Sequence, residues 1–154
     1  MRLIGPDGTH FELEVVGYQF PQMEFDPGSV DVNWLNIRLS VCGSDLSWAV
    51  VDPCLETLEV AHLARWFEAI AAGNAVDCDE IFTEATLRFA LLEGDPRKLR
   101  VYFWPGWAPS DGASTEDEDV YIECDASAEA LRTAAASLRA QLKKFPVRAA
   151  VGED

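Results

Sequence analysis

The side chains best suited to proton transfer near neutral pH are two histidines, His10 and His62. His10 follows a Gly8-Thr9 turn near the start of the chain, whereas His62 stands three residues after Glu59. If this segment is helical, Glu59 and His62 share one face, as the carboxylate and imidazole ligands of a bridged metal site do. Because such sites use a second pair and further carboxylates, the single pair favours a partly exposed helix face over a metal site.

Other catalytic motifs are missing from the sequence. No serine or cysteine stands in a nucleophile-elbow context, and no glycine-rich phosphate loop is present. The four cysteines lack the Cys-x-x-Cys spacing of a structural zinc site, and their scattered, mostly apolar contexts indicate free reduced thiols. The sequence therefore predicts a protein that is not an enzyme and that needs no metal ion and no cofactor. The cysteines are Cys42, Cys54, Cys78 and Cys124.

One aromatic and acidic segment remains as a candidate binding site. Its carboxylates lack the alternating ladder and closing Glu of a calcium loop, which leaves either a solvated loop or a contact for a basic partner. Tryptophans beside acids suit a hot spot for a basic protein. The predicted partner-binding residues are Trp104, Trp107, Asp111, Glu116, Asp117, Glu118 and Asp119. The other tryptophans, Trp34, Trp48 and Trp66, are expected in the core.

The charge of the chain supports a basic partner. There are 12 basic and 27 acidic side chains, a net charge of −15. Residues 1–125 alone hold 7 basic and 24 acidic side chains, a net charge of −17. Such a surface repels nucleic-acid phosphates and anionic membranes, although solubility alone accounts for the charge as well. We therefore expect a basic protein as partner, and neither nucleic acid nor a membrane.

Most of the chain is predicted to form the strands that position these residues. Apolar residues alternate with polar ones over residues 11–15, 35–41, 87–91, 99–103 and 120–124, the period of a half-buried strand. Gly43-Ser44-Asp45 supplies a turn before residues 46–51, so this part reads as a hairpin. We predict a mostly antiparallel sheet of six to seven strands. The segments 20–32 and 104–119 are left as long loops.

Two helices complete the predicted α+β fold. Val60, Leu63 and Phe67 recur at helical spacing in a central helix, for which Thr57 is the expected N-cap and Asp52-Pro53 an alternative start. Gly73-Asn74 ends this helix. The second helix is expected from about Ser127 to Phe145, with Pro146 as its stop. Both should pack on the sheet.

The length of 154 residues suits one domain, which we place at residues 1–148 with a frayed tail at 149–154. Near the N-terminus, Gly5-Pro6 interrupts the apolar sequence after the pair Leu3-Ile4. This segment therefore lacks the long apolar stretch of a signal peptide or membrane span. The expected location is the cytoplasm.

Several ordered residues resemble the WapI family of immunity proteins. The resemblance covers about residues 3–148 without the two loops, and its most specific part is the run from Asp52 to Glu59. It is carried by Asn33-Trp34-Leu35, Ser47-Trp48, Asp52-Pro53-Cys54-Leu55 with Thr57 and Glu59, Trp66, and Phe145-Pro146, together with Leu3-Ile4-Gly5, Phe11-Glu12-Leu13 and Gly17-Tyr18.

The resemblance implies a function for the chain. Members of this family are bacterial cytoplasmic proteins implied to neutralise the toxic domain of a polymorphic toxin, commonly a nuclease, by tight binding. This chain is then expected to bind a cognate basic toxin domain through its acidic surface. The alternative is a small-ligand-binding or regulatory module, which predicts a closed apolar cavity lined by Trp34, Trp48 or Phe89.

Overall fold

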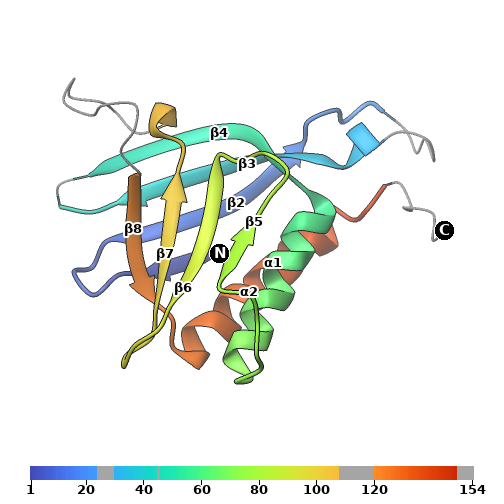
Figure 1. Ribbon diagram of the computed structural model, residues 1–154. Helices are drawn as coiled ribbons and strands as arrows, with labels where there is room; N and C mark the ends of the chain where they lie inside the picture. The colour runs from blue at the N-terminus through green and yellow to red at the C-terminus, as the bar shows by residue number, and fades with distance from the viewer. Residues whose placement is uncertain (24–29, 45, 108–119, 149–154) are drawn as a thin grey trace.

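The computed structural model describes residues 1–23, 30–44, 46–107 and 120–148, which form an α+β fold of two antiparallel sheets and two helices (Figure 1). The first sheet has the order β1-β2-β3-β4 and the second the order β5-β6-β7-β8. The strands of the first sheet are β1 (Arg2–Ile4), β2 (His10–Tyr18), β3 (Trp34–Cys42) and β4 (Ser47–Glu56). Those of the second are β5 (Asp79–Ile81), β6 (Leu87–Leu92), β7 (Lys98–Phe103) and β8 (Val120–Asp125).

The two sheets lie face to face with their strands crossed. In Figure 1 the strands β6, β7 and β8 pass in front of β2, β3 and β4, and the two helices lie side by side at one end. The contact is made by aromatic rings, since Phe11 of β2 meets Phe89 of β6 at 6.0 Å between ring centroids and Trp48 of β4 meets Phe103 of β7 at 5.0 Å. Buried side chains of both sheets and both helices form one hydrophobic cluster.

Alternation of apolar and polar residues produces the strands, as predicted. Phe11, Leu13 and Val15 of β2 are buried while Glu14 between them is exposed. The predicted hairpin is β3 and β4, with Val41 opposite Trp48. The α+β class and the antiparallel strands are confirmed. The described residues form eight strands in two sheets, where six to seven strands in one sheet were expected. The strands β1 and β5 were missed because three residues are too few for alternation to reveal.

The central helix α1 (Thr57–Ala71) starts one residue earlier than predicted. Glu56, not Thr57, is the N-cap: its backbone is extended, and its N–H donates to the Glu59 carboxylate at 3.0 Å. Thr57 is the first helical residue and is fully buried. Asp52-Pro53, the alternative start, belongs to β4. Gly73, with φ of 77°, follows the end of the helix in the left-handed region that favours glycine.

The C-terminal helix α2 (Ala128–Lys144) has the predicted ends. The Ser127 side chain caps it by accepting the Ala130 N–H at 3.2 Å, and Pro146 follows its C-terminal cap. Arg139 of α2 holds both carboxylate oxygens of Glu68 of α1 at 3.0 and 2.9 Å, which joins the helices on their exposed side. Neither described helix is long and apolar enough to span a membrane. The predicted tail, residues 149–154, lies outside the described residues.

Candidate functional site

The two tryptophans of the predicted binding segment have opposite environments. Trp104, directly after β7, is 52% exposed, whereas Trp107 is 7% exposed. The 3-10 turn η2 (Pro105–Trp107) sends the second ring inward, and the Trp107 N–H donates to the Trp104 carbonyl at 3.0 Å. The rings meet edge to face at 6.3 Å, so Trp107 supports Trp104 from behind. Asp111, Glu116, Asp117, Glu118 and Asp119 lie outside the described residues.

An acidic hollow of about 460 Å³ lies where η1 (Val30–Asn33), β4 and the β5–β6 loop meet. Asp31 comes from η1, Asp52 from β4 and Glu84 from the loop; Asp31 and Glu84 are exposed. Trp34, the first residue of β3, is half-buried beside them, which corrects its expected place in the core. The lining residues are Gln19, Phe20, Asp31, Trp34, Asp52, Pro53 and Glu84.

A bulge in β4 and the side chain of Arg148 shape this hollow. The register between β3 and β4 shifts between Leu35 and Ile37, where Ile37 faces Asp52 and Leu35 faces Leu55. The bulge accommodates Pro53, which has no N–H to give to a ladder. On the other side, the Arg148 guanidinium donates to the Phe20 carbonyl at 2.9 Å and lies 3.5 Å from the Tyr18 ring centroid. These contacts hold Phe20 at the rim.

Two pKa shifts reflect burial and negative charge near the hollow. Burial raises the pKa of Glu56, and the charges of Glu59 and Asp31 raise it further. Burial also raises the pKa of the Cys54 thiol to about 12, with Asp52 as the next cause. A cation entering the hollow would relieve this repulsion. Acids beside two aromatic side chains suit an arginine or lysine side chain of a partner.

Glu59 fixes the loop that forms one wall of the hollow. One carboxylate oxygen accepts the Glu56 N–H, and the other accepts the Thr83 N–H at 2.6 Å. Residue 83 belongs to the loop 82–86 between β5 and β6. Glu59 therefore joins the start of α1 to this loop. Both hydrogen bonds come from backbone N–H groups, so Glu59 does not form a site together with His62.

A groove of about 250 Å³, lined by both polar and apolar side chains, also borders the loop 82–86, and we call it the apolar groove for the apolar side chains that it exposes. Its large exposed apolar side chains are Ile81, at 64%, and Trp104. Arg88 stacks on Tyr102, 3.8 Å from the ring centroid, and pairs with Asp79 at 3.0 Å. The lining residues are Ile81, Ala85, Thr86, Leu87, Arg88, Tyr102, Phe103, Trp104 and Pro105. The acidic hollow and this apolar groove thus flank one loop.

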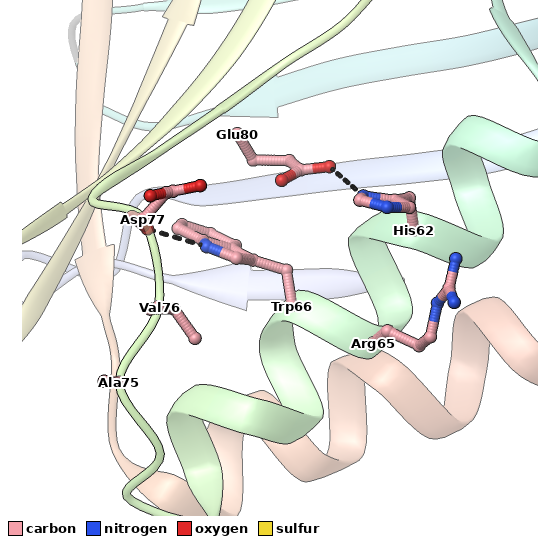
Figure 2. A pocket seen from close by; sticks show the side chains of 7 residues that line it. All are labelled: His62, Arg65, Trp66, Ala75, Val76, Asp77 and Glu80. Carbon is pink, nitrogen blue, oxygen red and sulfur yellow. Dashed lines mark hydrogen bonds and ion pairs between the residues drawn. The ribbon is translucent and has the colours of Figure 1, made fainter.

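A hollow of about 610 Å³ lies beside α1 and is lined by His62 (Figure 2). His62 points toward Glu80 of β5, with 3.1 Å between Nδ1 and Oε1, and its side chain is 64% exposed. Trp66 lies below this pair in Figure 2 and donates its indole N–H to the Asp77 carbonyl at 2.9 Å. His62 and Glu59 thus have different partners. Among the described residues, no group of three or more His, Cys, Asp or Glu side chains could hold a metal ion.

The cavity expected for a small-ligand module is not formed by its predicted residues. Phe89 is fully buried among Phe11, Phe67 and Phe82, at 5.8 to 6.1 Å between ring centroids. Trp48 packs on Phe103 in the same core. Trp34 lines a hollow, but that hollow is acidic. The four thiols are free; Cys54 and Cys124 are buried, and Cys42 and Cys78 are exposed.

Sequence reasoning missed the acidic hollow, and of the residues that line the apolar groove it identified Trp104 alone. Asp31, Asp52 and Glu84 are far apart in the sequence, and no local spacing connects them. The one signal for the hollow in the sequence was the run from Asp52 to Glu59. Asp52 lines the hollow, and Glu59 binds the loop 82–86.

Comparison with known proteins identifies one family. The model of the family described as "Immunity protein WapI-like family" matches residues 2–146, nearly the whole described chain. The match includes both flanks of the loop 82–86 and both helices. Searches of curated proteins and of solved structures gave no significant match.

Proposed function

Because this chain belongs to the immunity protein WapI-like family, we propose that it protects its producer by binding and neutralising a cognate toxin domain without catalysis. The family supports an immunity role and a protein partner. Our proposal adds that the toxin is a basic domain of a polymorphic toxin, such as a nuclease, and that the complex forms in the cytoplasm. A nuclease that grips phosphates presents a basic surface, which an acidic inhibitor can cover.

The acidic hollow is the observation that carries this proposal. Asp31, Asp52 and Glu84 converge there beside Trp34, from three separate elements. A cationic side chain of the toxin would be paired with carboxylates and stacked on an aromatic ring at one place. We propose the segment after Trp107, with Asp111, Glu116, Asp117, Glu118 and Asp119, as a second electrostatic contact. Trp104 and its support Trp107 precede that segment.

Co-expression with the toxin tests the function directly. We expect a toxin gene next to the gene for this chain, and its toxin domain should stop bacterial growth when it is produced alone. Growth should return when the full chain is produced with it, and the two proteins should co-purify as one complex. Rescue without a complex would point to an enzymatic or regulatory action, and no rescue would refute the immunity role toward this toxin.

Neutralising the acids should slow association with the toxin. Asp31→Asn, Asp52→Asn and Glu84→Gln together remove three carboxylates of the hollow while keeping side-chain size. We expect the association rate at low salt to fall by about tenfold, because electrostatic steering raises such rates by about 10 to 10³. The dependence on salt should become flatter, since charges are screened over about 8 Å at 0.15 M. Stopped-flow mixing over a series of salt concentrations measures both.

A second variant distinguishes the contribution of the acids at positions 116–119 from that of the acidic hollow. Serine at positions 116–119 removes Glu116, Asp117, Glu118 and Asp119 and leaves the hollow intact. Thermal stability should stay nearly unchanged, because a run of four acidic side chains is expected to stay in water, where charges contribute little to folding. Unchanged rates at low salt in both variants would show that acidic steering plays no part in toxin capture, whereas a loss in one alone identifies the group that acts.

A further inference from the structure

We infer that the apolar groove beside Trp104 is the docking point for an apolar side chain of the toxin domain, next to the acidic hollow that takes a cationic one. This inference rests on the proposed function and adds a surface to it. The groove and the hollow share the loop 82–86, because Glu84 lines the hollow while Ala85 and Thr86 line the groove. A partner that covers this loop therefore contacts both.

The groove presents apolar side chains that solvent reaches. Ile81 is 64% exposed and Trp104 is 52% exposed, and they line one groove from β5 and from the end of β7. In protein complexes, a tryptophan that the partner buries, next to an aliphatic residue, is typical of the centre of the interface. In the part of the chain that the structure describes, both side chains keep apolar surface in contact with water, and docking of a partner would remove this surface from water.

The ring of Trp104 is held in place before any partner arrives. A β-carbon at position 106 would lie 2.6 Å from this ring, so Gly106 allows the ring to rest on the backbone of η2. Trp107 meets the ring edge to face, and the Trp104 N–H donates to the Thr86 carbonyl at 2.7 Å, which fixes η2 against the loop 82–86. Ordering a side chain on binding has an entropic cost, and a ring that is already fixed avoids most of it.

Charge on the groove does not oppose docking. Arg88, the cation that lines it, is paired with Asp79 and stacked on Tyr102. The same arrangement recurs between β7 and β8, where Arg100 pairs with Glu123 at 2.8 Å and stacks on Tyr121 at 4.2 Å from the ring centroid. Covering paired and stacked guanidinium groups leaves no lone cation in the interface. The groove is thus a nearly neutral surface on a chain with a net charge of −15.

The hollow selects the basic toxin domain as occupant over a second copy of this chain. Two copies facing each other through the loop 82–86 would bring Glu84, Asp31 and Asp52 of one copy close to the same carboxylates of the other. Like charges in such an arrangement repel. A basic domain has the opposite effect, because its cations pair with the hollow while an apolar side chain fills the groove.

Three substitutions and one matched control test the inference. Trp104→Ala should raise the Kd for the cognate toxin domain by about 30-fold or more, mostly through faster dissociation. Gly106→Ala keeps the tryptophan but displaces its ring, and Ile81→Ser removes the aliphatic residue; each should weaken binding by about tenfold. Ile4→Ser is the control, since Ile4 is 53% exposed in β1 and lines neither the groove nor the hollow. It should leave the Kd within about twofold of the wild type.

The readout is surface plasmon resonance with the full chain, after thermal unfolding has verified that each variant is folded. If Trp104→Ala and Ile81→Ser bind and neutralise the toxin like the wild type, the inference is wrong and the proposed function still stands. If the wild type itself does not bind the toxin, both are wrong. A concentration-dependent dimer of the free chain that Trp104→Ala abolishes would assign the groove to self-association and also overturn the inference.

Discussion

Replacing Phe89 with alanine is expected to lower the free energy of unfolding by about 3–5 kcal/mol, the usual cost of removing a buried phenylalanine. Phe89 is fully buried, and its ring meets Phe11 of the first sheet, Phe67 of α1 and Phe82 after β5. It is therefore a point at which both sheets and the central helix contact one side chain. The cavity left behind cannot be closed by one neighbour alone, because the three rings come from different elements.

Urea unfolding followed by tryptophan fluorescence measures this loss, and the melting temperature should fall by roughly 10 °C in a chain of this size. Tyr121→Ala is the matched control, an aromatic residue of the same sheet that is 45% exposed on the outer face. It should cost less than about 1 kcal/mol. Equal losses in the two variants would mean that Phe89 does not hold the sheets together.

Much of the fold could be predicted from the sequence because most strands bury one face. Alternation marks β2, β3, β6, β7 and β8, and the spacing of Val60, Leu63 and Phe67 marks α1. The division into two crossed sheets leaves no such mark, since it depends on which apolar faces meet. The N-cap of α1 was misplaced by one residue because the Glu59 carboxylate caps the backbone where a threonine hydroxyl was expected.

The candidate site was less predictable, because its parts meet only in the fold. Trp104 and Trp107 are three residues apart, yet the turn η2 exposes one and buries the other. The acids of the hollow come together through a bulge in β4 and through the loop 82–86, both of which depend on tertiary packing. Composition predicted an acidic surface but not the place where acids and aromatic side chains meet.

The Glu59 side chain joins the loop 82–86 to the start of α1, so Glu59→Ala is expected to affect both stability and binding. The substitution removes both bonds to the Glu59 carboxylate, from the Glu56 and Thr83 N–H groups. Each hydrogen bond to a charged group contributes about 1.5–3 kcal/mol, but one of these two is exposed and the other is only partly buried, so we expect the free energy of unfolding to fall by about 2 kcal/mol in total. Glu59→Gln retains one acceptor oxygen and should lose about half as much.

The effect on toxin binding distinguishes a positioning role from a merely stabilising one. Freed from Glu59, the loop no longer holds Glu84 at the hollow or Ala85 and Thr86 at the groove, so the Kd for the toxin domain should rise. Glu68→Ala, which breaks the exposed pair with Arg139, should leave the Kd unchanged and cost less than about 1 kcal/mol.

His62→Ala tests whether Glu59 and His62 act as the pair that the sequence suggested. If it weakens toxin binding as much as Glu59→Ala does, Glu59 and His62 act together and the loop is not the reason for the effect.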